Sequence, residues 1–265
     1  MKIKELVSAL ERFAPLPLQD GFDNAGLQIG LTEVEATGAL LCLDVTEAVL
    51  DEAIALGYNL VISHHPLIFK GYKSITGKDY VERCILKAIK NDIVIYSAHT
   101  NLDNAYGGVN YKIAEKIGLK NLQVLEPKEN SLQDDLTQAG AGIMGELDEP
   151  ETELEFLKRI KKTFEVGCVR HNRLTGREIQ KVALCGGAGA FLLPQAIRAG
   201  ADVFITGEIK YHDYFGHEGD ILMAEIGHYE SEQYTKEIFY SIIRDLFPNF
   251  ALQSSKINTN PIKYL

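Results

Sequence analysis

The sequence predicts an α/β fold made of two similar halves. Two observations predict it: the order apolar strand, amphipathic helix, apolar strand occurs twice along the 265 residues, and the two copies align without a gap. The chain is longer than one typical domain, which favours one large or two small domains. Its 46% hydrophobic and 24% charged residues are ordinary values for a globular protein that folds by burial alone.

The first half begins with a predicted helix over residues 2–13, because apolar residues recur there at helical spacing and prolines follow. Residues 40–43 then form a predicted buried strand, and Thr46 is placed to cap a helix that ends at Gly57. Residues 60–63 are a second apolar strand. This β-α-β order predicts a parallel pair of strands joined by a right-handed crossover.

The second half repeats this order. Residues 182–185 are a predicted strand, residues 191–199 a helix, and residues 203–206 another strand, and one constant offset aligns Cys42 with Cys185 and Gly57 with Gly200. A further match, at a different offset, aligns residues 92–95 with residues 220–223. We therefore expect an internal duplication, and the alternative is that any two β-α-β units look alike.

A polar stretch over residues 126–138 is a predicted surface linker, which places one half at residues 1–125 and the other at 126–265. A helix is predicted to begin at Pro150. Near the end of the chain, a helix around residues 238–246 and a strand over 250–253 are expected, and both can pack back on the first half.

Charge and cysteine content exclude several classes of partner. There are 27 basic and 37 acidic residues, and a net charge of −10 repels nucleic-acid backbones and anionic membrane surfaces. The four cysteines form no CxxC pair, so neither a zinc ribbon nor a disulfide framework is indicated. The first residues lack a signal-peptide core, and no apolar run is long enough for a membrane span. We expect a soluble, cytoplasmic protein that binds neither membrane nor nucleic acid. A small anionic substrate is still compatible with the negative net charge, because a local metal or basic site can bind it.

Histidines are placed where the fold predicts a binding site. His64 and His65 directly follow the strand over residues 60–63, at the carboxyl edge where parallel sheets bind ligands. In a turn, two adjacent imidazoles can both reach a metal ion. The alternative is a structural pair whose hydrogen bonds are satisfied within the fold.

A histidine followed four residues later by a carboxylate occurs once in each half, after equivalent strands. If the halves pack around a pseudo-two-fold axis, both motifs join the His-His pair. Three imidazoles and two carboxylates suit two cations, with a bridging carboxylate offsetting the repulsion between them. Separate core histidines and surface carboxylates are the alternative. The motifs are His99 with Asp103, and His228 with Glu232.

Six motifs spread over nearly the whole chain make it similar to a known family. They are residues 23–28 (DNAGLQ), 63–66 (SHHP), 99–103 (HTNLD), 185–189 (CGGAG), 206–208 (TGE) and 227–232 (GHYESE). On these motifs the chain resembles the NIF-three-like family, whose members carry the name GTP cyclohydrolase 1 type 2 homologue.

The resemblance implies a fold, an assembly and a ligand set. The fold is two similar, interleaved α/β domains with the metal site between them, and the assembly is a toroidal homohexamer, a trimer of dimers. Glu232 would bridge two divalent ions, and His99 would lie beside the metals without binding them. Longer members insert an extra domain at the middle connection, where this chain has only the polar stretch. The implied metal ligands are His64, His65, Asp103, His228 and Glu232.

Other residues have two interpretations each. The glycine-rich turn at Gly186, Gly187 and Gly189 either contacts an anion through backbone amides or is a tight strand-to-helix turn. Glu208 and His212 follow the strand over 203–206, and are either pocket groups for binding and proton transfer or part of a surface turn. Two further histidines, His171 and His217, have no such context and are expected to be ordinary surface or packing residues.

The function expected from these residues is a dinuclear metal hydrolase acting on a nucleotide or another small phosphorylated molecule. The family name implies GTP as substrate, although no residue stands out as recognising guanine. His99 or His212 would shuttle the proton. Zinc, iron or manganese fit mixed nitrogen and oxygen ligands. The competing hypothesis is a metal-binding assembly or partner-binding protein without turnover.

Overall fold

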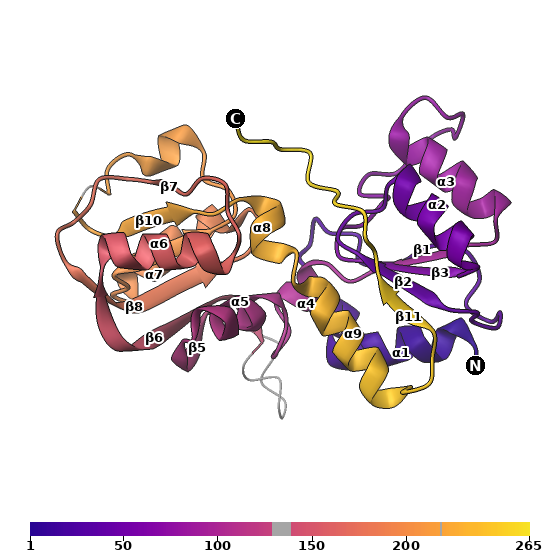
Figure 1. The fold of residues 1–265 in the computed structure, drawn as a ribbon, viewed down its shortest axis with the longest axis horizontal. Coiled ribbons are helices and arrows are strands. Elements are labelled where there is room, and N and C mark those ends of the chain that lie inside the picture. Colours follow the sequence, from indigo (N-terminus) through magenta and orange to yellow (C-terminus); the bar gives the residue numbers. More distant parts are fainter. Residues whose placement is uncertain (129–138, 218) are drawn as a thin grey trace. The chain divides into compact units, whose positions relative to one another are not determined.

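The computed structural model describes residues 1–128, 139–217 and 219–265, and it is a mixed α/β fold with two sheets (Figure 1). The chain divides into two compact units. Unit 1 comprises residues 1–102 and 235–261, and unit 2 comprises residues 103–234 and 262–265. Most of the polar stretch predicted as a linker, residues 129–138, lies outside the described residues.

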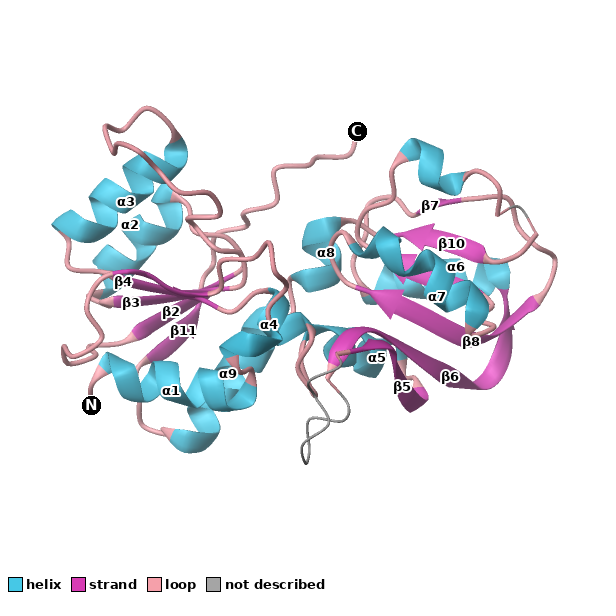
Figure 2. Ribbon diagram, turned by 180° about the vertical axis from the view of Figure 1, so that it is seen from behind, coloured by secondary structure: helices cyan, strands magenta, loops and turns pink. Residues whose placement is uncertain are grey.

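Unit 1 contains a five-stranded sheet in the order β1-β4-β3-β2-β11, in which only β1 is antiparallel to its neighbour. Helices α2 and α3 cover one face of the sheet and α1 and α9 cover the other (Figure 2). The strands are β1 (Gly26–Ile29), β2 (Ala39–Cys42), β3 (Leu60–Ser63), β4 (Val94–Ser97) and β11 (Leu252–Ser254). The helices are α1 (Ile3–Phe13), the 3₁₀ helix η1 (Leu16–Leu18), α2 (Glu47–Leu56), α3 (Tyr80–Lys90) and α9 (Thr235–Leu246).

The local signals found in the sequence of unit 1 explain its elements. Strands β2, β3 and β4 are buried at every position, as their continuous apolar runs predict for parallel strands covered on both faces. Helix α2 begins where the Thr46 hydroxyl accepts from the amide of Val49, and it ends at Gly57 in the left-handed conformation (φ 69°). The predicted helix over 2–13 is confirmed as α1.

Unit 2 contains a six-stranded sheet in the order β5-β6-β8-β9-β10-β7. Helices α5 and α6 pack on one face and α7 on the other (Figures 1 and 2). The strands are β5 (Lys120–Pro127), β6 (Gly140–Thr152), β7 (Arg170–His171), β8 (Glu178–Cys185), β9 (Val203–Thr206) and β10 (Leu222–Glu225). The helices are α5 (Val109–Ile117), α6 (Glu153–Thr163), η3 (Gly189–Leu192), α7 (Leu193–Arg198), η4 (Tyr211–Tyr214) and α8 (His228–Glu232), and α4 (Thr100–Asp103) carries the chain from unit 1 into unit 2.

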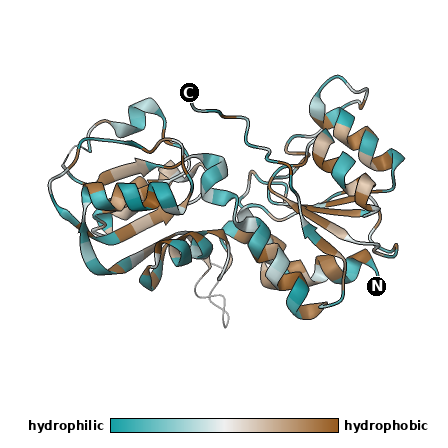
Figure 3. Ribbon diagram, in the orientation of Figure 1, coloured by the Kyte–Doolittle hydropathy of each residue, from teal (hydrophilic) through white to brown (hydrophobic). Residues whose placement is uncertain are grey.

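Hydrophobic residues gather on the central strands and on the helix faces turned toward them (Figure 3). Each sheet therefore has its own core. Fully buried side chains such as Leu50 and Ile95 belong to the core of unit 1, and Phe204 and Met223 to that of unit 2. The burial of these apolar side chains is the main stabilising contribution in each unit.

The strands of the two sheets are paired in the same register. Cys42 pairs with Ser63 between the parallel strands β2 and β3, and Cys185 pairs with Thr206 between β8 and β9. The gap-free alignment matches Cys42 with Cys185 and Ser63 with Thr206, so residues that align in sequence are also paired in the same way.

The next strand of each sheet keeps this agreement. Ser97 of β4 pairs with Ser63, and Glu225 of β10 pairs with Thr206, so β4 and β10 correspond. This pairing continues the predicted match of residues 92–95 with residues 220–223 at the same offset. Beyond β4 and β10 each sheet has one antiparallel strand, β1 in unit 1 and β7 in unit 2.

Two boundaries differ from the sequence expectations. Unit 1 ends at residue 102 and not near 125, because α5 and β5 pack with β6 and β8 of unit 2. Helix α9 and strand β11 do return to unit 1, as the sequence allowed, since β11 extends its sheet beside β2. The helix start predicted at Pro150 is wrong: β6 continues through Pro150 to Thr152, which forms a capping box with Glu155 and begins α6.

Among the described helices, none is both long and apolar enough to cross a lipid bilayer.

Candidate metal centre

Three histidines of unit 1 converge at the carboxyl ends of two adjacent parallel strands. His64 and His65 directly follow β3, and His99 lies just after β4. Neighbouring parallel strands end at the same edge, so these side chains meet. Each offers one ring nitrogen, and the three nitrogens lie within 4.8 Å of one another. The structure thus brings His99 into one group with the predicted ligands His64 and His65.

His64 is fully buried and held by the backbone. Its Nδ1 lies 2.8 Å from the carbonyl oxygen of Ala98. A carbonyl only accepts, so Nδ1 carries the proton and Nε2 carries the lone pair that a metal ion needs. The amides of His64 and His65 both donate to the carbonyl of Leu43, which fixes the turn after β3.

His65 is oriented by a carboxylate. Its Nδ1 lies 2.7 Å from Oδ1 of Asp44, and Oδ2 of Asp44 accepts from the hydroxyl of Thr259. Burial would raise the pKa of Asp44, but the hydrogen bonds from His65 and Thr259 outweigh burial and lower it, so the carboxylate stays ionised. The segment containing Asp44 was expected to be an ordinary cap. Thr46 does cap α2, but Asp44 has the additional role of fixing the tautomer of His65.

His99 has the same arrangement. Its Nδ1 lies 2.7 Å from Oδ1 of Asp23, whose other oxygen accepts from the amide and the hydroxyl of Thr100. Burial alone would raise the pKa of Asp23, but the hydrogen bonds from His99 and Thr100 lower it to about 2. Asp23 belongs to the DNAGLQ motif, and no role for it followed from the sequence.

A pocket of about 310 Å³ opens beside His65 within unit 1. Asp44, Tyr80 and Thr259 contribute polar atoms to its wall, and Leu67 is among its apolar lining. A small molecule bound there would lie against the imidazole of His65.

In unit 2, helix α8 carries both members of the predicted pair His228 and Glu232. The Nε2 of His228 lies 3.1 Å from Oε2 of Glu232, and its Nδ1 lies 2.8 Å from Oε1 of Glu208. The Glu232 side chain is only 4% exposed. Hydrogen bonding to both carboxylates requires a proton on each ring nitrogen, and a metal ion bound between Nε2 and Glu232 would replace one of them. Glu208, predicted as a pocket group, is thus the partner that orients His228.

The glycine-rich turn packs directly against this pair. Gly187 has φ 59°, and a Cβ atom on it would lie 2.3 Å from Oε1 of Glu232 and 3.3 Å from Nε2 of His228. Only glycine therefore combines this backbone conformation with this approach.

The amides of the turn are engaged within unit 2. Those of Gly186 and Gly187 donate to the side chains of Asn110 and Ser231, and the amide of Gly189 donates to the Thr206 hydroxyl. Of the two interpretations of the sequence, this favours a tight turn that supports Glu232 over an anion cradle.

Asp103 and His212 lie in different surroundings. The Asp103 carbonyl accepts from the Asn110 side chain, which also binds the turn at Gly186. Asn110 thus connects a predicted ligand to the turn beside Glu232, a role that no local sequence signal indicates. The His212 ring contacts the rings of Tyr211 and Phe215 on the exposed η4 segment.

The donor set fits a divalent metal ion. In unit 1, Nδ1 of each of the three imidazoles faces an acceptor, which leaves the lone pair that a metal ion or a proton can use on Nε2. In unit 2, a buried carboxylate and an imidazole approach each other through their ligating atoms. Imidazole nitrogen with carboxylate oxygen suits zinc, iron and manganese. Among the described residues, unit 1 thus holds a group of three imidazoles that could bind a metal ion, and unit 2 holds the pair of His228 and Glu232.

Known proteins resemble the chain over its whole length. Residues 1–261 match the family model Duf34/NIF3 (NGG1p interacting factor 3). A GTP cyclohydrolase 1 type 2 homolog of Clostridium perfringens is 37% identical over 235 residues, covering 88% of this chain and 87% of that protein. One from Lactococcus lactis is 34% identical over 271 residues and covers 98% of both chains. The crystal structure of the Staphylococcus aureus hypothetical protein SA1388 superposes with a TM-score of 0.90 at 33% identity, covering 100% of this chain and 99% of that one. The chain belongs to the Duf34/NIF3 family.

Proposed function

We propose that the protein binds divalent metal ions and hydrolyses a nucleotide or another small phosphorylated molecule. The observation that carries the proposal is the three-imidazole cluster of unit 1, in which every Nδ1 faces an acceptor, so that Nε2 of His64 and His65 can bind a metal ion and Nε2 of His99 lies close beside them. Histidines that only packed against one another in a core would not all have to be in the same tautomer. The names of the relatives, GTP cyclohydrolase 1 type 2 homologs, support hydrolysis of a nucleotide.

We propose two ions per chain. Five ligands exceed what one open site uses, and Glu232 is the bridging candidate because its buried carboxylate lies against His228. A common site that draws ligands from both units is a prediction of the sequence motifs. The proposed ligands are His64, His65, Asp103, His228 and Glu232.

An internal duplication is part of the proposal. It is supported by the registers of β2-β3-β4 and β8-β9-β10, which agree with the two gap-free sequence matches. A duplication would explain why a histidine with a carboxylate four positions later follows β4 in unit 1 and β10 in unit 2. A homohexamer, expected from the resemblance, is also proposed, and light scattering of the purified protein tests it.

The residues divide the chemical tasks. Bound divalent ions supply a Lewis acid and lower the pKa of coordinated water. Asp44 holds His65 in the ligating tautomer. Asp23 keeps the proton on Nδ1 of His99, so that Nε2 of His99 can accept a proton from water and return it to a leaving group. The pocket beside His65 provides the space in which a substrate is positioned.

Metal analysis tests the binding proposal. Protein purified without chelator or metal-binding tag should contain two equivalents of divalent ion, and His65→Ala and Glu232→Ala should each lower this content. His217→Ala, which removes an imidazole elsewhere in unit 2, is the matched control and should leave it unchanged. Full occupancy in both ligand variants would refute the ligand assignment.

Measurements of turnover distinguish a metal-dependent hydrolase from a metal-binding protein without catalytic activity. On a panel of nucleotides and phosphate esters, His99→Ala should retain both ions and lose metal-dependent hydrolysis. Unchanged rates would remove His99 from the mechanism. The description of the family as an interacting factor favours the second candidate, a metal-binding protein that acts through a partner. A wild-type protein loaded with metal but inactive on the whole panel would support that candidate.

A further inference from the structure

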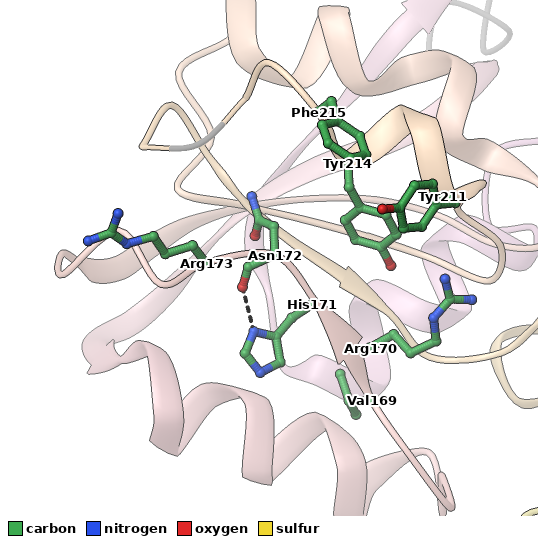
Figure 4. Close-up of a pocket in the computed structure, with 8 residues that line it drawn as sticks. All are labelled: Val169, Arg170, His171, Asn172, Arg173, Tyr211, Tyr214 and Phe215. Carbon is green, nitrogen blue, oxygen red and sulfur yellow. Dashed lines mark hydrogen bonds between the residues drawn. The ribbon is translucent and has the colours of Figure 1, made fainter.

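Two pockets, one in each unit, differ in what they offer a ligand. The pocket of about 590 Å³ in unit 2 lies between β7 and η4, and none of the proposed metal ligands lines it. Figure 4 shows the Arg173 side chain extending away from the rings of Tyr211 and Phe215, so these groups do not converge on one ligand position. The pocket of about 310 Å³ in unit 1 has His65 in its wall. Its other wall groups therefore bear on what a substrate at the metal centre can be.

Three polar side chains in the wall of the unit 1 pocket have hydrogen-bonding capacity to spare. The Asp44 carboxylate lies against Nδ1 of His65 and accepts from Thr259, which uses about two of its roughly four acceptor positions. The oxygen of the Thr259 hydroxyl can still accept. The Tyr80 hydroxyl makes no hydrogen bond with any other described residue. Burial raises the pKa of Tyr80, so its hydroxyl stays protonated at neutral pH and can donate.

The charges in the wall favour an uncharged ligand group. The described residues that line the pocket include no lysine or arginine, and an anion would lie near the Asp44 carboxylate without a cationic partner. A cation would lie near His65, which is a proposed ligand of a divalent ion. Burying a charge without a partner costs free energy. A neutral hydroxyl group avoids both costs, because it can donate to Asp44 and accept from Tyr80.

The wall is held in place by hydrogen bonds within unit 1. Tyr80 is the first residue of α3, whose capping residue Asp79 accepts from the amide of Glu82. The carboxylate of Glu82 in turn accepts from two amides of the loop before α3. Next to the apolar part of the wall, the amide of Ile68 donates to the side chain of Gln28. A ligand would therefore enter a preformed pocket and would lose little free energy in ordering it.

We propose that this pocket binds an uncharged, hydroxylated group of sugar size, and that Tyr80 selects it. The substrate class is then a phosphate ester of a sugar or polyol, with its phosphate at the metal centre. Val45 and Leu67, which are buried, provide apolar surface for the carbon atoms, and Asp44 and Tyr80 bind the hydroxyls. The proposal rests on the proposed function, because it assigns the organic part of that substrate.

Calorimetry on the metal-loaded protein tests the proposal with three phosphate esters that share a five-carbon chain, while phosphate release is followed in the same samples. Ribitol 5-phosphate carries hydroxyls, pentyl phosphate is apolar, and 5-aminopentyl phosphate ends in a cation. Ribitol 5-phosphate should bind most tightly. Tyr80→Phe, which removes only the hydroxyl, should weaken it about fivefold, the loss expected for one hydrogen bond. The same variant should bind pentyl phosphate and metal like the wild type. Tyr240→Phe, on α9 of unit 1, is the matched control and should change nothing.

Three results would overturn the proposal. They are binding of pentyl or 5-aminopentyl phosphate as tight as that of ribitol 5-phosphate, wild-type affinity of Tyr80→Phe for ribitol 5-phosphate, and an equal loss for all three esters, which would place the effect at the metals. Selective binding without phosphate release would instead refute hydrolysis and leave this pocket assigned. Phosphate release from all three esters at equal affinity would do the reverse.

Ribitol alone tests the pocket in the absence of metal. With protein treated with EDTA, NMR saturation transfer to millimolar ribitol should be seen with the wild type and should be reduced with Tyr80→Phe. Equal transfer from the two proteins would overturn the role of Tyr80 whether or not the chain binds metal.

Discussion

The hydroxyl of Thr259 donates to Oδ2 of Asp44 across 2.5 Å, although 215 residues separate them in the chain. The other oxygen of the same carboxylate faces Nδ1 of His65. The segment after β11 is anchored on the way by Ser255, which donates to Glu52. The end of unit 1 therefore fixes the orientation of a proposed metal ligand at the end of β3.

Thr259→Val should weaken metal binding without removing any ligand. The substitution keeps the shape of the side chain but leaves Asp44 with one hydrogen bond fewer, so His65 is held less firmly. Loss of such a supporting group typically costs about tenfold or more in affinity. Competition for Zn²⁺ with a chromophoric chelator measures this. Lys256→Ala, in the same segment, should bind Zn²⁺ like the wild type, and equal affinity of Thr259→Val would show that the hydroxyl has no such role.

Gly187→Ala should disturb the pair of Glu232 and His228. Both Gly187 (φ 59°) and Gly200 (φ 73°) are left-handed, so alanine at either position should cost about 1 kcal/mol of stability from backbone strain. Only at Gly187 would the new methyl group meet the Glu232 carboxylate, whereas Gly200 faces open space. Gly187→Ala should therefore also lower metal content, measured by elemental analysis beside thermal unfolding. Identical metal content in the two variants would contradict the packing argument.

Local signals predicted much of the fold. Continuous apolar runs identified the parallel strands, Thr46 and Gly57 marked the ends of α2, and the gap-free alignment anticipated the equal registers. The error at Pro150 has a physical reason. Pairing with β8 continues to Thr152 at the end of β6, so sheet hydrogen bonds there outweighed a local proline signal for a helix start.

The supporting residues of the site could not be predicted in the same way. Asp44 and Asp23 are isolated carboxylates 21 and 76 positions from the histidines that they orient, and no spacing rule connects such pairs. The parallel pairing of β2 with β3 places Asp44 beside His65, and the antiparallel pairing of β1 with β4 places Asp23, which precedes β1, beside His99. The position of His64 and His65 at the end of β3 was predictable, because strand and motif are contiguous in the sequence.

Glu82 should make the protein more stable at neutral than at acidic pH. Hydrogen bonds from the amides of Lys78 and Thr76 lower the pKa of this carboxyl from its ordinary value. A lowered pKa in the folded state stabilises the fold above the unfolded-state value near about 4.3, and this stabilisation is lost as the pH falls through the folded-state pKa. Glu82→Gln should thus lower the melting temperature at pH 7, and the difference from wild type should shrink below about pH 4.

Thermal unfolding from pH 7 to pH 3 measures this effect, with Glu115→Gln as the exposed control, whose side chain is 70% accessible. A difference between Glu82→Gln and wild type that stays constant over the whole range would show that ionisation of Glu82 does not contribute.

Removal of metal should lower the stability of the wild type. Ions that bind only the folded state stabilise it by about 2.7 kcal/mol when present at about 100 times Kd. For a chain of this size that corresponds to a loss of about 5–10 °C in melting temperature on treatment with EDTA. The double variant His65→Ala with Glu232→Ala should melt at nearly the same temperature with and without EDTA, because it lacks one of the proposed ligands in each unit. If EDTA lowered its melting temperature as far as that of the wild type, the stabilising ions would have to be bound elsewhere in the chain.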